Sequence, residues 1–157
     1  MTKMVVAPNA VFRRRMQQVR EQHPMTRRQL AARLAEIGFA MDRTTITKTE
    51  QGRRKTVPLD DVFAIAYALD VSPAFLLLPY AKEHVAVAPN VGPEDSVRLE
   101  LWLRGDEPLP GQDRRRFLRE LPPDRLAQLH KAALELEYGR PHPTEGRPSR
   151  EKDDREG

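Results

Sequence analysis

Helix-starting and helix-breaking residues divide the first eighty positions into segments that can hold only short helices. Pro24, Gly38, Gly52 and Pro79 interrupt the chain at intervals. Between them, apolar residues recur at spacings of three and four, the period of a helix with one buried face. No run alternates in the way that a half-buried strand does. The pattern predicts an all-α domain of five short helices with brief connections.

Capping residues place the starts of these helices. Thr26 with Gln29 three residues later has the arrangement of a capping box, and Asp42 is a natural N-cap for a third helix running to about Glu50. Ser72-Pro73 is typical of the start of a fifth. The apolar stripes expected to be buried are Phe12, Met16 and Val19 in the first helix, Leu30, Leu34 and Ile37 in the second, and Leu59, Val62, Phe63, Ala66 and Leu69 in the fourth.

The remaining segments are expected to differ in order. Residues 1–9 are predicted to be a loose arm, and residues 80–93 a linker because of their prolines and glycine. Residues 94–138 are predicted to be a small helical C-terminal region. Within it, the stretch 94–104 favours a helix, with a strand as the alternative. The charged, Pro- and Gly-rich residues 139–157 are predicted to be a disordered tail.

Positive charge is concentrated in the N-terminal half. Residues 1–80 hold thirteen Lys and Arg against seven Asp and Glu, whereas residues 81–157 hold fourteen against sixteen. This asymmetry favours a polyanionic partner for the first half. The chain has no cysteine for disulfides or thiolate metal sites, no apolar run approaching the ~20 residues of a membrane span, and no N-terminal signal pattern. A cytoplasmic protein is expected.

Three segments together carry a functional motif: TRRQLA at 26–31, DRTTITKTEQG at 42–52 and LDVSP at 69–73. Their order and spacing resemble the Cro and phage-repressor class of helix-turn-helix regulators, also called the xenobiotic-response-element class. The resemblance covers residues 11–79. It implies that the helix from Asp42 to Glu50 enters the major groove of double-stranded DNA. The base-reading side chains it implies are Arg43, Thr44, Thr47 and Lys48.

The residues of this segment support the same role. Ile46 supplies an apolar face for packing, while Arg, Lys and Thr side chains can hydrogen-bond to base edges. The alternative is a solvated surface helix of an ordinary bundle. That alternative accounts for Arg43 and Lys48 but not for four threonines in one short helix, since Thr is a middling helix former.

Other basic and polar residues are expected to contact phosphates, which adds salt-dependent affinity without reading sequence. They are Arg27 at the start of the second helix and Gln51, Arg53, Arg54 and Lys55 after the third. Arg13, Arg14 and Arg15 occupy consecutive helical positions and cannot all face DNA, so at most one is expected near a phosphate.

Two features depart from the family pattern. The connection from Leu34 to Asp42 is longer than usual by about five residues, so either the second helix extends or the turn bulges. Thr49 also stands where the family has an apolar core residue. Both features affect how the recognition helix is presented to DNA.

The C-terminal region offers a surface for partners. Four apolar residues lie there at helical spacings: Leu126, Leu129, Ala133 and Leu136. They can form a homodimer or pack on Trp102, Phe117 and Leu121, and the two roles are compatible. The leading interpretation is a repressor that binds a roughly palindromic operator as a homodimer. The alternative is an antitoxin-like or adaptor protein that binds a second protein through residues 94–138. The four histidines are scattered and no cofactor or nucleophile motif is present, so neither metal, cofactor nor enzymatic activity is expected.

Overall fold

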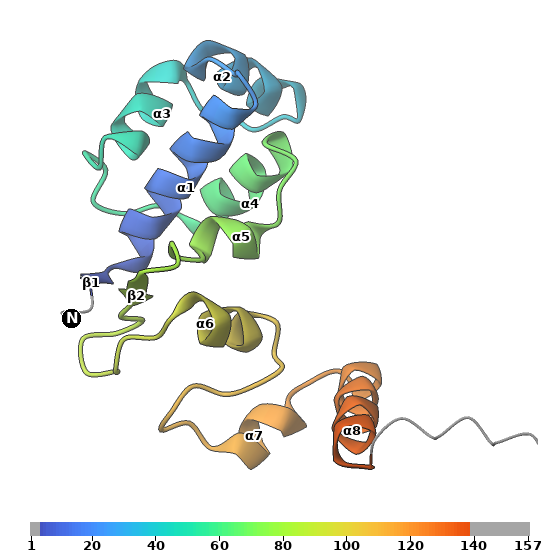
Figure 1. Cartoon of the computed structure of the whole chain (residues 1–157). Helices are drawn as coiled ribbons and strands as arrows, with labels where there is room; N and C mark the ends of the chain where they lie inside the picture. The colour runs from blue at the N-terminus through green and yellow to red at the C-terminus, as the bar shows by residue number, and fades with distance from the viewer. Residues whose placement is uncertain (1–3, 139–157) are drawn as a thin grey trace, which may run out of the picture. The chain divides into compact units, whose positions relative to one another are not determined.

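The computed structural model describes residues 4–138 (Figure 1). It divides into two compact units, one up to Phe117 and one from Leu118 onward. The first unit begins with β1 (Met4–Val6) and the helices α1 (Pro8–Gln22), α2 (Arg27–Glu36), α3 (Arg43–Glu50), α4 (Leu59–Ala68) and α5 (Pro73–Leu77). It continues with β2 (Glu83–Val85), α6 (Ser96–Leu103) and most of α7 (Arg114–Arg119). The second unit contains α8 (Pro123–Tyr138). The predicted mostly helical fold is confirmed.

The first five helices enclose the main hydrophobic core. Apolar side chains from every one of them meet there, and α1 packs against both α3 and α5. The fully buried members are Phe12, Met16, Leu30, Leu34, Ile46, Ile65, Leu69 and Leu76. Burying such side chains stabilises the fold by roughly 1.5–3 kcal/mol each relative to leaving them in water. This core fixes the position of α3.

The predicted caps are present. The Thr26 hydroxyl accepts from the Gln29 backbone N–H, and the Gln29 side chain accepts from the Thr26 backbone N–H at 2.8 Å, which completes the capping box of α2. Asp42 Oδ1 accepts from the Thr45 N–H at 2.7 Å at the start of α3. The Ser72 hydroxyl accepts from the Ala74 N–H at 3.2 Å at the start of α5.

The buried face of α4 differs from the prediction. Leu59 and Phe63 were expected in the core, but they are 67% and 56% exposed, and Ile65 is buried instead. Val62, Ala66 and Leu69 are buried as expected. The helical period explains the difference, because Leu59, Phe63 and the exposed Tyr67 follow one another at intervals of four along a neighbouring face.

The long stretch from Leu34 to Asp42 is taken up partly by the end of α2 and partly by a hydrogen-bonded turn. α2 runs to Glu36, and Gly38 follows with φ +79°. The N–H of Phe39 donates to Leu34 O and that of Gly38 to Ala35 O, the two bonds of a Schellman motif. Only residues 39–42 then remain before α3. Ile37, expected in the core, is the exposed C-cap of α2.

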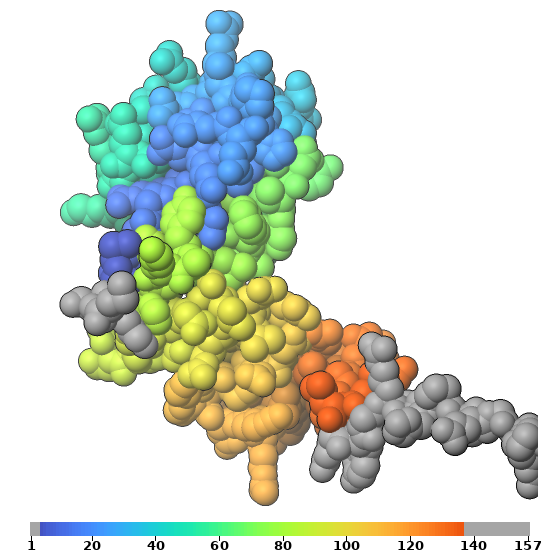
Figure 2. Space-filling model, in the orientation of Figure 1, coloured from blue at the N-terminus to red at the C-terminus, as the bar shows by residue number. Residues whose placement is uncertain are grey.

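Two segments predicted without regular structure contain short strands. Part of the expected loose arm forms β1, and part of the expected linker over 80–93 forms β2, and the two pair in parallel with Val5 opposite His84. A second apolar cluster of Val11, Val85 and Leu99 lies beside this pair. Figure 2 shows the atoms around β2 (yellow-green) against those of α1 (blue). Three-residue strands are too short to produce a detectable alternation, which is why the sequence did not predict them.

The C-terminal region is helical, as predicted. Ser96–Leu103 is a helix, α6, not the alternative strand, and its Trp102 packs against the cluster around Val11 and Val85. α8 lies wholly within the region predicted to be helical. None of the helices in residues 4–138 is long and apolar enough to cross a membrane. The predicted disordered tail, residues 139–157, lies outside the described residues.

Candidate nucleic-acid interface

Helix α3 has one buried face and one face open to solvent. Ile46, Thr49 and Glu50 are buried on the inner face. Arg43, Thr44 and Lys48 are exposed on the outer face, and Thr47 is half-buried beside them. The helix has eight residues, so its outer face is a short row of cationic and hydroxyl side chains. A helix of this kind can present hydrogen-bonding groups to base edges in a major groove.

The N-terminus of α3 is held by its cap. Hydrogen bonds from the side chain and backbone N–H of Thr45 hold the pKa of Asp42 below its ordinary value. The carboxylate is therefore ionised at neutral pH and lies at the positive end of the helix dipole. This cap fixes the start of α3, where Arg43 and Thr44 project.

A buried ion-pair network joins α3 to α1 and α2. The Glu50 carboxylate is fully buried and accepts from Arg20 Nε at 2.6 Å and from Arg27 Nε at 2.6 Å. Arg20 also donates to Met25 O at 2.8 Å. The hydrogen bonds from Arg20 to Glu50 raise the pKa of Arg20 above its ordinary value. The network holds the three helices in a fixed relation.

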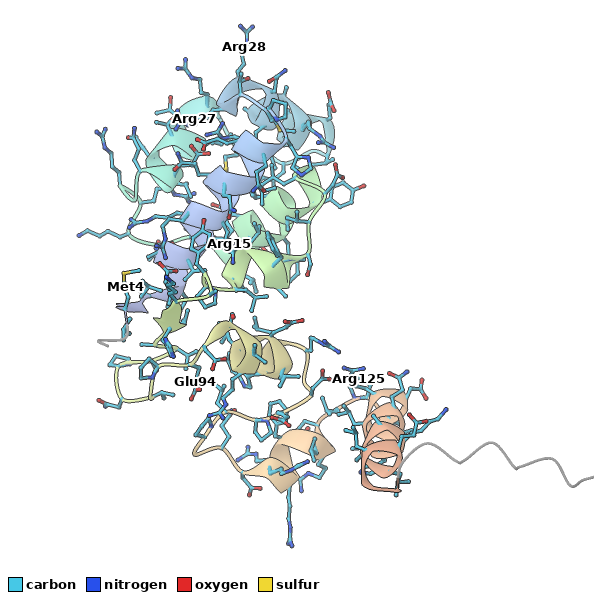
Figure 3. The ribbon with its side chains drawn as sticks, in the orientation of Figure 1. Met4, Arg15, Arg27, Arg28, Glu94 and Arg125 are labelled. Carbon is cyan, nitrogen blue, oxygen red and sulfur yellow. The ribbon has the colours of Figure 1, made fainter. Side chains whose placement is uncertain are left out.

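Arg27 has a structural contact as well as an exposed part. Its Nε is bound to Glu50, while its side chain is 32% exposed at the start of α2. Figure 3 shows Arg27 beside α3, whereas its neighbour Arg28 points away from the fold. Arg27 is therefore held in place by the protein before any partner binds.

The residues after α3 fall into two groups. Gln51, Arg53 and Lys55 are exposed. Arg54 is instead tied to the fold, since its Nη1 lies 2.6 Å from Asp61 Oδ2 and 3.3 Å from Thr49 Oγ1. Of the predicted phosphate-binding residues, Arg27 and Arg54 are thus partly engaged within the fold, and Gln51, Arg53 and Lys55 are exposed.

Residues 11–76 match a family model described as a helix-turn-helix domain. This part of the chain is a helix-turn-helix domain. The match confirms the resemblance inferred from the sequence and supports DNA as the partner. Comparisons with curated proteins and with solved structures found no match.

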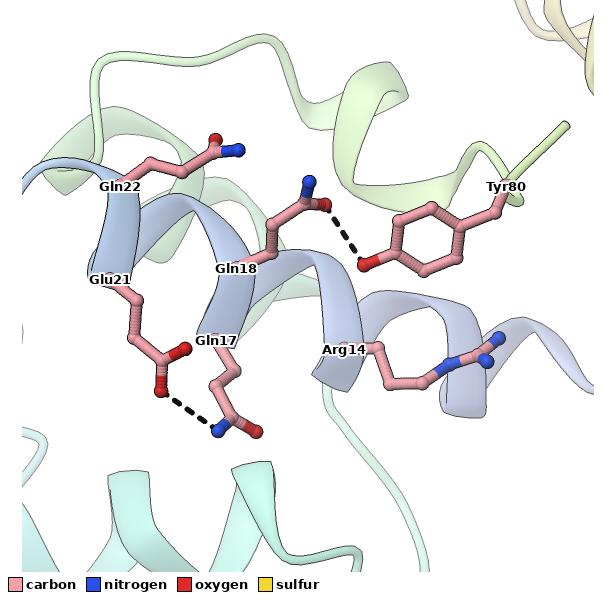
Figure 4. Close-up of a pocket in the computed structure, with 6 residues that line it drawn as sticks. All are labelled: Arg14, Gln17, Gln18, Glu21, Gln22 and Tyr80. Atoms are coloured by element: carbon pink, nitrogen blue, oxygen red, sulfur yellow. Dashed lines mark hydrogen bonds between the residues drawn. The ribbon is translucent and has the colours of Figure 1, made fainter.

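Within the helix-turn-helix domain, two of the three consecutive arginines of α1 contact the segment that follows α5. Arg14 donates two hydrogen bonds to Glu83, and the one from Nη2 to Oε2 measures 2.8 Å. Arg15 donates to Leu78 O at 2.8 Å and lies over the Tyr80 ring, 4.2 Å from its centre. Tyr80 in turn donates to Gln18 Oε1 at 2.9 Å, in a shallow polar pocket of α1 (Figure 4). These contacts could not be predicted from the sequence, because they join residues more than sixty positions apart.

Thr49 fits the core of the helix-turn-helix domain despite its hydroxyl. The hydroxyl donates to Thr45 O at 2.9 Å within α3, so burial leaves it hydrogen-bonded. Thr47 makes the equivalent bond to Arg43 O at 2.8 Å. The hydroxyl oxygen of Thr47 still has accepting capacity, and its methyl group is available for apolar contact. The departure at Thr49 is therefore accommodated without a polar group left unpaired.

Proposed function

We propose that this protein is a sequence-specific DNA-binding transcriptional regulator that reads the major groove with α3. The observation that carries the proposal is the outer face of α3, where Arg43, Thr44 and Lys48 are exposed on a helix anchored by Ile46 and Glu50. A rigidly held helix with cationic and hydroxyl groups on its free face suits direct readout of base edges.

The base contacts are assigned by side-chain chemistry. Arg43 and Lys48 suit the acceptors O6 and N7 of guanine, and Thr44 and Thr47 suit a thymine methyl group or a base-edge hydrogen bond. The phosphate contacts are assigned to Arg27, Gln51, Arg53, Arg54 and Lys55. Among these, the exposed Arg53 and Lys55 are free to reach out, whereas Arg27 and Arg54 would contribute from positions already fixed by Glu50 and Asp61.

The regulator is proposed to act as a homodimer on a roughly palindromic operator, as a cytoplasmic repressor. Two copies related by a twofold axis place two recognition helices about one helical turn of DNA apart. The contact between copies is assigned to the apolar residues of α8, where Leu136 is 87% exposed. Repression follows if the bound dimer blocks access to the operator.

Selection of bound duplexes from a random DNA pool tests the readout. The wild-type protein is expected to enrich a roughly palindromic consensus, and Arg43→Ala/Lys48→Ala to lose it, because each lost base contact removes about 1–3 kcal/mol of discrimination. Arg98→Ala/Lys131→Ala removes the same two residue types from exposed positions on α6 and α8 and is expected to keep the consensus. No enrichment by the wild type, or a consensus kept by the α3 variant, would contradict direct readout.

A second candidate function is an antitoxin-like or adaptor protein. The observation that favours it is that α8 exposes two large apolar side chains, Leu134 at 55% and Leu136 at 87%. An adaptor would use residues 94–138 to bind a different protein. It is expected to co-purify with a stoichiometric second protein, whereas a self-contained regulator is expected to purify alone.

A further inference from the structure

The first two turns of α1 lie along the loop that follows the recognition helix (Figure 1). Asn9 Nδ2 donates to Lys55 O at 3.1 Å, which ties the start of α1 to this loop. Arg13 comes four residues later, on the same face of the helix. Its guanidinium lies against Gly52, since a Cβ built at Gly52 would lie only 2.7 Å from Arg13 Cζ. Arg13 is therefore placed at the C-terminal end of α3.

Arg13 differs from its two neighbours in having no internal partner. Arg14 is bound to Glu83 and Arg15 to two backbone carbonyls. For Arg13, no hydrogen bond or ion pair is found within residues 4–138. The exposed Arg53 and Lys55 lie in the loop beside it, also without an ion pair to the described part of the chain. Arg13, Arg53 and Lys55 thus belong to segments that touch at Gly52 and Asn9, and no ion pair of any of them is found within residues 4–138.

Gly52 is the residue that permits this arrangement. Its φ of +70° is a backbone conformation that residues other than glycine rarely adopt. Because it has no side chain, the Arg13 guanidinium can occupy the space where a Cβ would lie. The guanidinium lies against Gly52 and makes no hydrogen bond within residues 4–138, so its donors remain available to a partner. A planar group with unused donors, next to a loop that carries the exposed Arg53 and Lys55, is suited to bind a phosphate bidentately.

We propose that Arg13 binds a phosphate of the DNA backbone beside the recognition helix. This inference rests on the proposed function and adds a residue of α1 to the interface. The bond is formed to the sugar–phosphate chain, so Arg13 positions α3 on the duplex and contributes affinity without base preference. Arg14 and Arg15 are not part of this contact.

The salt dependence of DNA binding tests the proposal. The dissociation constant of the full chain is measured with the selected duplex and with a scrambled duplex between 50 and 200 mM salt. Each phosphate contact contributes about 0.9 to the slope of log affinity against log salt. Arg13→Gln is expected to flatten the slope by that amount on both duplexes, so that its deficit relative to wild type shrinks about 3.5-fold across this fourfold salt range. Arg13→Lys is expected to keep the slope, because it keeps the charge.

A pair of glycine variants tests the position of the guanidinium separately from its charge. Gly52→Ala forces the Arg13 guanidinium to move, whereas Gly38→Ala imposes a similar backbone strain with nothing within 4 Å of the new Cβ. Gly52→Ala is expected to weaken binding to both duplexes and Gly38→Ala to leave it near wild type, with the melting temperature of each confirming that it is folded.

The outcomes separate the two proposals. A folded Arg13→Gln with the wild-type slope overturns the role of Arg13 and leaves the proposed function standing. Equal binding by the two glycine variants shows that the position of the guanidinium does not matter, which also overturns it. A wild-type protein that binds neither duplex at 50 mM salt overturns the proposed function and this inference together.

Discussion

At the scale of single residues, Glu50 is the side chain that joins α3 to both α1 and α2. Its carboxylate is fully buried and is bound by two arginines from two other helices. A buried ion pair contributes little net stability over an apolar substitute, but removing one partner leaves the other as an uncompensated buried charge. Arg20, whose side chain is only 8% exposed, would be that charge.

The variant Glu50→Ala is therefore expected to lower the free energy of unfolding by about 3–5 kcal/mol. Urea unfolding followed by circular dichroism measures the change. Glu36→Ala, an exposed carboxylate in the last turn of α2, is the matched control and is expected to stay within about 0.5 kcal/mol of wild type. Equal effects of the two variants would show that the buried network does not hold the helices together.

At the scale of elements, the sequence predicted what local signals determine. The capping box at Thr26, the cap at Asp42 and the Ser72-Pro73 start all appear as predicted, because each depends on residues within three positions of one another. α6 also forms where a helix was favoured over a strand, and its start is held by Asp95, which accepts from the Arg98 N–H at 2.9 Å and had not been predicted as a cap. The exposed face of α3 also followed from its own sequence.

Contacts between distant segments could not be predicted in this way. β1 and β2 pair across almost eighty residues, and neither strand is long enough to show a pattern of its own. The orientation of α4 depends on which of two adjacent apolar faces meets α2 and α5, which the helix alone does not determine. Likewise, only the fold distinguishes Arg13 from Arg14 and Arg15, since the three are equivalent in sequence.

Because of the orientation of α4, truncating Ile65 is expected to destabilise the protein more than truncating Phe63, although Phe63 has the larger side chain. Ile65→Ala is expected to lower the free energy of unfolding by about 2–5 kcal/mol, because Ile65 is fully buried and its removal leaves a cavity. Phe63→Ala removes a larger side chain but one that is 56% exposed, so its effect is expected to be clearly smaller. Urea denaturation of both variants measures the difference, and a larger loss for Phe63→Ala would mean that the face predicted from sequence is the buried one.

At the scale of the whole molecule, the two halves of the chain divide the proposed work. The basic first half holds the helix-turn-helix domain, with Arg43 and Lys48 on α3 and Arg53 and Lys55 in the loop after it. The second half has slightly more acidic than basic residues, which disfavours a second DNA-binding surface there. Its apolar stripe on α8, at spacings of three, four and three, has the period by which two helices pack along a common seam. DNA binding and dimerisation are thus assigned to separate parts.

If α8 forms the contact between two copies, charged residues on its apolar stripe are expected to separate them. Leu129→Lys/Leu136→Lys places two charges on the stripe and is expected to reduce the mass measured by light scattering from twice 18.0 kDa to 18.0 kDa. Affinity for a palindromic duplex is expected to fall, while affinity for a single half-site is kept, because the reading helix is untouched. Ala127→Lys/Gln128→Lys adds the same charge away from the stripe and is expected to remain dimeric. A stripe variant that stays dimeric would place the contact elsewhere, and a wild-type monomer would favour a different protein as the partner of α8.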